Sequence, residues 1–202
     1  MLIPFLFLIV SLFIYTVFYF RINRVIILSL KIFTSLMFLT MGILAARNKN
    51  DDYSFWIVLG LSAGVVGDIL LGFQRVDRKR KGIYFLFGLF AFLLGHCFYI
   101  VAFSKLLRFE TFVLIVPIVL TLLTSPFLNK AKIRPLLAKY TVFIYALTSA
   151  LLLTIALRNA IVNMSYLSII GVFAIISFIS SDILLFLLYF RNPKRYLRMI
   201  KY

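Results

Sequence analysis

The chain has 202 residues, of which 64% are hydrophobic and only 14% are charged, and its formal net charge is +16. This composition excludes a soluble domain and indicates an integral membrane protein. The 22 Lys and Arg side chains lie almost entirely in short links between apolar segments, where membrane topology explains them, so we expect no nucleic-acid binding.

A single cysteine, Cys97, excludes an internal disulfide, and a single histidine, His96, excludes a multi-histidine metal site. We therefore expect neither a metal nor another cofactor.

Seven apolar segments, each close to the length needed to cross a bilayer, follow one another along the chain. The first has no basic residue before Arg21 and no cleavage site of small residues, so we interpret it as a retained span rather than a signal peptide. The sequence predicts an all-α, polytopic transmembrane helix bundle that forms a single domain over residues 1–202. The predicted spans are 2–20, 25–45, 55–73, 82–103, 111–128, 138–157 and 166–190.

The distribution of Lys and Arg predicts the orientation in the membrane. Sixteen of them lie on one side, at Arg21 and Arg24, in the 75–81 and 130–139 links and in the tail after residue 190, whereas five lie on the other. Because positive residues stay in the cytoplasm, the N-terminus is expected outside and the C-terminus in the cytoplasm.

Two carboxylates lie inside these apolar segments, in Gly67-Asp68-Ile69-Leu70-Leu71 and in Ser181-Asp182-Ile183-Leu184-Leu185. An ionisable group inside a span is costly, and by default it indicates a functional site. The alternative is a structural hydrogen bond to a neighbouring helix. At 1.5 Å per residue, the two aspartates lie at depths of roughly 8 and 12 Å from the cytoplasmic boundary, so they could meet if their parallel helices are neighbours.

Two further polar residues reach a similar depth, Lys31 at roughly 9 Å and Tyr145 at roughly 10 Å. Lys31 could pair with an aspartate, or its long side chain could extend to the interface, and the sequence leaves both open. By the same count, His96 lies roughly 21 Å from the cytoplasmic boundary, and so closer to the outer face. The small residues beside the aspartates are typical of close helix packing: Gly60, Gly64, Gly67, Gly171, Ala174, Ser177 and Ser181.

Three motifs together resemble the hallmark of the YhhN family of lysoplasmalogenase-like membrane proteins. They are Ser62-x4-Gly67-Asp68-x2-Leu71, Phe92-x3-His96-x2-Tyr99-x3-Phe103 and Ser181-Asp182-x2-Leu185. Lys31 and Tyr145 also fall where that family tends to carry a Lys and a Tyr. Two features differ from the family pattern. Residues 31–32 are Lys-Ile where the family commonly has Lys-Pro, and the family usually has eight spans, whereas a basic tail, 191–202, follows the seventh here.

The resemblance implies a membrane-embedded hydrolase that cleaves the vinyl-ether bond of lysoplasmalogens, with a lysophospholipid taken from the membrane, in a bacterial cell membrane. On this interpretation Asp68 and Asp182 divide the acid and stabilising roles, and which does which stays open. Lys31 and Tyr145 would tune and position them. The expected lining or supporting residues are His96, Tyr99, Ser62 and Ser181. Two alternatives remain: a small proton- or cation-coupled transporter, and a non-catalytic lipid-binding protein.

Overall fold

The computed structural model describes residues 2–18, 23–47, 49, 51–77, 79–105, 111–130 and 136–190, and all regular structure in these ranges is helical. The predicted all-α fold is confirmed. The helices are α1 (Leu2–Phe18), α2 (Arg24–Ala46), α3 (Asp52–Val76), α4 (Lys81–Ser104), α5 (Thr111–Lys130), α6 (Leu136–Asn163) and α7 (Tyr166–Phe190).

Each predicted span coincides with one helix, and most ends agree within three residues. The largest difference is at the end of α6, which continues through Arg158 to Asn163 instead of ending at 157. A charged residue near the end of a span marks the limit of the apolar segment, but it does not break the helical hydrogen bonds.

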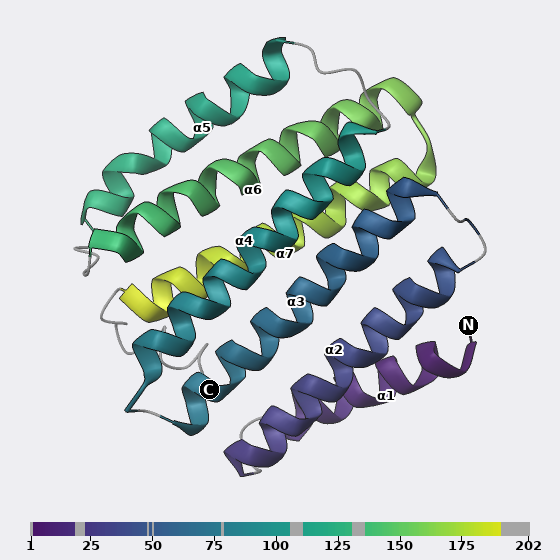
Figure 1. Cartoon of the computed structure of the whole chain (residues 1–202), viewed down its shortest axis with the longest axis vertical. Coiled ribbons are helices and arrows are strands. Elements are labelled where there is room, and N and C mark those ends of the chain that lie inside the picture. Colours follow the sequence, from purple (N-terminus) through teal and green to yellow (C-terminus); the bar gives the residue numbers. More distant parts are fainter. Residues whose placement is uncertain are drawn as a thin grey trace. The chain divides into compact units, whose positions relative to one another are not determined.

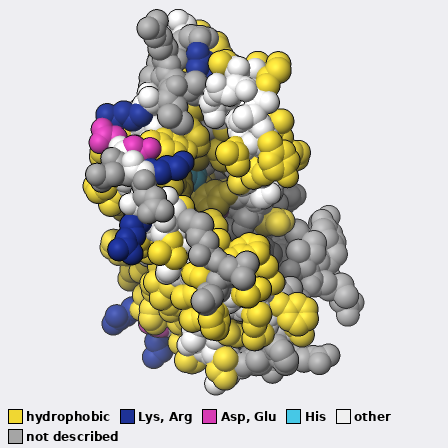
Figure 2. Space-filling view, turned by 90° about the vertical axis from the view of Figure 1, so that its right-hand side faces the viewer, with side chains coloured by type: hydrophobic (Ala, Val, Ile, Leu, Met, Phe, Trp, Pro, Cys, Tyr) yellow, Lys and Arg dark blue, Asp and Glu magenta, His cyan; other side chains and the backbone are white. Residues whose placement is uncertain are grey.

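Among the described residues, five helices are long and apolar enough to cross a membrane, judged by length and composition: α2, α3, α4, α6 and α7. The apolar stretches described in α1 and α5 are shorter, Pro4–Tyr15 and Thr111–Pro126. Hydrophobic side chains cover much of the surface in Figure 2, and large ones such as Phe13, Phe87 and Phe173 are exposed. A surface of this kind suits contact with lipid.

The chain divides into two compact units, Met1–Leu106 and Leu107–Tyr202. In the first unit α3 lies between α2 and α4, and α1 packs against α2 (Figure 1). In the second unit α6 lies between α5 and α7. Within each unit, consecutive helices run antiparallel, as their short links require.

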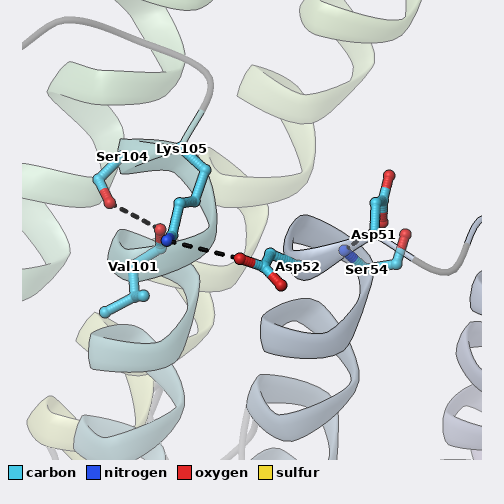
Figure 3. Close-up of polar contacts among 6 residues, drawn as sticks. All are labelled: Asp51, Asp52, Ser54, Val101, Ser104 and Lys105. Carbon is cyan, nitrogen blue, oxygen red and sulfur yellow. Dashed lines mark hydrogen bonds and ion pairs between the residues drawn. The ribbon is translucent and has the colours of Figure 1, made fainter.

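Polar side chains fix the end of the first unit where α3 begins and α4 ends (Figure 3). Asp51 caps α3, because its Oδ1 accepts the backbone N–H of Ser54 at 2.8 Å. Hydrogen bonds from the side chain and then the backbone of Ser54 lower the pKa of Asp51 below its ordinary value of 3.8. The ammonium nitrogen of Lys105 lies 3.6 Å from Asp52 Oδ2, an exposed pair that contributes little to stability.

Candidate functional site

Asp68 of α3 is held by two donors from α2. The ammonium nitrogen of Lys31 lies 2.8 Å from Asp68 Oδ1, and the hydroxyl of Ser35 donates to Oδ2 at 2.6 Å. The side chains of Lys31 and Asp68 are less than a third exposed, at 28% and 29%. The sequence left two interpretations of Lys31 open, extension to the interface and pairing with an aspartate. In the structure Lys31 pairs with Asp68.

A glycine brings α2 and α3 close together at this point. Gly72 follows Asp68 by four residues and so lies on the same face of α3. Leu28 of α2 occupies the position that a Cβ on Gly72 would take. Leu28 is buried and precedes Lys31 by three residues, on the same face of α2. Because Gly72 has no side chain, α2 and α3 can approach closely enough for Lys31 to reach Asp68.

The Phe92–Phe103 motif of α4 packs against the glycines of α3. The ring of Phe92 lies against Gly67, where an added Cβ would be 2.7 Å from the ring, and the ring of Tyr99 covers Gly60. These glycines therefore serve helix packing, the role that their spacing predicts. Asp68, next to Gly67 in sequence, is directed instead to α2.

In the second unit, Tyr145 of α6 donates its phenol hydrogen to Asp182 Oδ2 of α7 at 2.6 Å. Tyr145 is only 7% exposed, so this contact lies inside the unit. The backbone carbonyl of Tyr145 also accepts the hydroxyls of Thr148 and Ser149, at 3.0 and 2.8 Å. The two residues that the sequence placed at similar depth are thus in direct contact.

The hydrogen bonds and the ion pair described above involve none of the other four predicted site residues. Ser62 donates its hydroxyl to the carbonyl of Val58 in its own helix at 2.8 Å, and Ser181 is exposed on α7. His96 is buried in the first unit, with 1% exposure, and Tyr99 packs on Gly60. The roles expected of these four residues stay predictions. So does the meeting of Asp68 with Asp182, because the two residues belong to different units.

Ser35 is the site residue that the sequence analysis did not single out. A signal for it was present, since Ser35 follows Lys31 by four residues and must share its helical face. A serine in an apolar helix is more often bonded to its own backbone, which is why the residue type alone was uninformative. No group of three His, Cys, Asp or Glu side chains able to hold a metal ion occurs among the described residues.

A family model, described as the YhhN family, matches residues 26–202. The chain belongs to the YhhN family. The match extends from residue 26 of the first unit through the second unit, and it includes Lys31, Asp68, Tyr145 and Asp182. No curated protein and no solved structure matches this YhhN protein. The contacts at Asp68 and Asp182 are therefore the main structural guide to its chemistry.

Proposed function

We propose that this YhhN protein is a membrane-embedded hydrolase that cleaves the vinyl-ether bond of lysoplasmalogens. The products would be a fatty aldehyde and glycerophosphoethanolamine or glycerophosphocholine. One observation carries the proposal: each intramembrane aspartate is bonded by polar side chains of a neighbouring helix, Asp68 by Lys31 and Ser35, and Asp182 by Tyr145. Placing ionisable and polar groups inside apolar helices is energetically unfavourable, so their presence favours a functional role for these residues. The association of the YhhN family with lysoplasmalogenase activity supports this choice of substrate class.

The reaction needs an acid and a negative charge at one substrate. A carboxyl group in its acid form gives its proton to the β-carbon of the vinyl ether, and the electrons of the C=C bond form the new C–H bond. The product is an oxocarbenium ion, which a carboxylate beside it stabilises, much as in glycoside hydrolysis.

Water then adds to the cationic carbon and returns a proton to the carboxylate left by the first step. The resulting hemiacetal breaks its C–O bond to release the aldehyde and the glycerol hydroxyl. One water is consumed, and the acid is regenerated. Asp68 and Asp182 would supply the two carboxyl groups, so the proposal requires both to reach the same substrate molecule.

The substrate would reach the protein sideways from a bilayer. We place the protein in a bacterial cell membrane. The distribution of Lys and Arg favours an orientation with the N-terminus outside and the basic links in the cytoplasm. The lipid headgroup would then stay near these basic links, and the vinyl ether would enter to the depth of the aspartates.

Release of fatty aldehyde from a lysoplasmalogen by the purified protein tests the proposal. We expect turnover of the vinyl-ether lysolipid, none of the matching alkyl-ether lysolipid, and loss of at least a thousandfold in Asp68→Asn and Asp182→Asn. Asp52→Asn is the matched control, because this carboxylate lies on α3 with an 81% exposed side chain.

Full activity in Asp68→Asn or Asp182→Asn would remove that residue from the chemistry. Lysolipid binding without turnover would instead indicate a lipid-binding protein. Proton flux in proteoliposomes without any lysolipid would indicate a transporter.

A further inference from the structure

The two donors that bind Asp68 differ in how many hydrogens they have left to give. Ser35 has one hydroxyl hydrogen, and Asp68 Oδ2 accepts it at 2.6 Å. The Lys31 ammonium has three N–H donors. Among the described residues its one polar partner is Asp68, whose Oδ1 lies 2.8 Å from the ammonium nitrogen. Lys31 is therefore the group beside Asp68 that can still donate a hydrogen bond to a ligand.

The pair that Lys31 forms with Asp68 is partly accessible, since the side chains are 28% and 29% exposed. A molecule that reaches the carboxylate can therefore also reach the ammonium. An N–H group in an apolar environment is costly when no acceptor is present. A ligand with an acceptor oxygen at this position would thus gain a hydrogen bond and remove that cost.

The acceptor that suits Lys31 is neutral rather than anionic. The Asp68 carboxylate offsets the positive charge of the ammonium and repels an anion such as a phosphate group. In the proposed orientation the two side chains also lie roughly 8 and 9 Å below the cytoplasmic boundary. The phosphate of a lysolipid would stay near the basic links at that boundary, so a neutral oxygen of the lipid is the available acceptor.

A lysolipid has such an oxygen next to its ether. The glycerol carbon that bears the ether is bonded to a carbon that bears a free hydroxyl, and these two oxygens can lie within hydrogen-bond distance of each other. The ammonium nitrogen of Lys31 and Oδ1 of Asp68 are at a similar separation, 2.8 Å. A substrate whose vinyl ether reaches Asp68 would therefore bring this hydroxyl to Lys31.

We infer that Lys31 donates a hydrogen bond to the free hydroxyl next to the ether of the lysolipid, and that binding depends on this hydroxyl. The inference rests on the proposed function. It deepens that function by giving Lys31 a contact with the substrate in addition to its ion pair. The contact involves only α2 and α3 of the first unit.

Binding of two alkyl-ether lipids to the purified protein tests this contact. One is the alkyl-ether lysolipid, and the other is its deoxy counterpart, in which hydrogen replaces the hydroxyl while chain and headgroup stay the same. We expect the wild type to bind the hydroxyl lipid about tenfold more tightly, because the donor is charged. Lys31→Met should reduce this preference to about threefold or less. It should bind the deoxy lipid as the wild type does, which also verifies folding.

Lys105→Met is the matched control, because it removes the lysine of another ion pair of the same unit, 3.6 Å from Asp52. It should leave the preference for the hydroxyl lipid unchanged. Lys31→Arg keeps a positive charge with several N–H donors, so it should retain most of the preference.

Equal binding of the two lipids by the wild type would overturn the inference without any variant. A loss of affinity in Lys31→Met that is the same for both lipids would also overturn it, because the deoxy lipid keeps the phosphate and lacks only the hydroxyl. The proposed function is tested separately, by aldehyde release from a lysoplasmalogen. Absence of release by a wild type that prefers the hydroxyl lipid would reject the hydrolase and keep the contact at Lys31.

Discussion

Gly95 of α4 and Gly60 of α3 bring the backbones of the two helices into contact. A Cβ added to Gly95 would lie 3.2 Å from the carbonyl oxygen of Gly60, and a Cβ on Gly60 would enter the ring of Tyr99. The obstacle to Gly95 is a backbone atom, which cannot turn aside as a side chain can. This contact holds α3 against α4, while the other side of α3 presents Asp68 to α2.

Gly95→Ala should destabilise the protein, because the two backbones must separate to admit the methyl group. We expect a loss of about 1–3 kcal/mol, measured by thermal unfolding in detergent. Gly64→Ala is the control, since nothing lies within 4 Å of a Cβ there and alanine is the better helix former. Equal stability of the two variants would contradict close packing at Gly95.

The Lys31–Asp68 pair should appear as a coupling free energy in a double-mutant cycle. Lys31→Met and Asp68→Asn each remove one partner of a mostly buried contact, so each should destabilise the protein by about 1–3 kcal/mol. The double variant should lose less than the sum of the two, with a coupling of about 1–2 kcal/mol. Additive losses in thermal unfolding would mean that the two charges do not interact.

The positions of the helices could be predicted from the sequence because the apolar segments are bounded by charged links, and the seven helices follow that pattern. Depth along the helices placed Tyr145 at a height similar to that of Asp182, but it did not indicate which aspartate Tyr145 would contact. Whether Lys31 pairs with an aspartate could not be predicted from the sequence, because a lysine near the end of a span can reach the membrane interface as easily as an aspartate on a neighbouring helix. The decisive feature is tertiary: Leu28 packs where Gly72 lacks a side chain, and this brings α2 close enough to α3.

The Phe92–Phe103 motif shows what helical spacing leaves open about aromatic side chains. The family resemblance implied that His96 and Tyr99 line or support the site, and that role stays a prediction. In the structure the rings of Phe92 and Tyr99 fill the spaces left by Gly67 and Gly60. Because a ring filling a glycine notch and a ring lining a cavity have the same helical spacing, only the partner helix distinguishes them.

The cap of α3 should make stability depend on acidity. Since hydrogen bonds from Ser54 lower the pKa of Asp51 in the folded protein below 3.8, the Asp51 contribution is fully present above the unfolded pKa. It is lost as the pH falls through the lower, folded pKa. Asp51→Asn keeps a capping acceptor but does not titrate, so its midpoint temperature relative to the wild type should rise as the pH falls from 6 to about 3. A constant difference over this range would exclude the linkage.

A shared substrate requires Asp68 and Asp182 to be close enough to act on one lipid, and cysteine cross-linking tests this requirement. Cys97 is the single cysteine of the chain and is exposed, so Cys97→Ser gives the background. We expect Asp68→Cys with Asp182→Cys to be bridged by a short bifunctional thiol reagent. Asp52→Cys with Asp182→Cys is the control, since Asp52 lies sixteen residues, or about 24 Å, along α3 from Asp68. Failure of the first pair to react, with both thiols accessible to a single-ended reagent, would reject the two-aspartate mechanism.

Tyr145→Phe separates the orientation of Asp182 from its presence. Tyr145 is 7% exposed and its hydroxyl donates to Asp182 Oδ2 at 2.6 Å, so the substitution removes this hydrogen bond and keeps the ring. We expect kcat for aldehyde release to fall about tenfold to a hundredfold, because a carboxyl group that is no longer held in line meets the reacting atoms of the substrate less often. The unfolding free energy should fall by only about 1–2 kcal/mol.

Tyr140→Phe is the matched control, because Tyr140 lies on the same helix and is 57% exposed. It should leave both kcat and the unfolding temperature unchanged. A Tyr145→Phe protein that loses stability but keeps its kcat would assign the Tyr145 hydrogen bond to folding alone. A loss of kcat at nearly constant stability would instead link the Tyr145 hydrogen bond to the reaction, since the carboxyl group of Asp182 would still be present and only its direction would have changed.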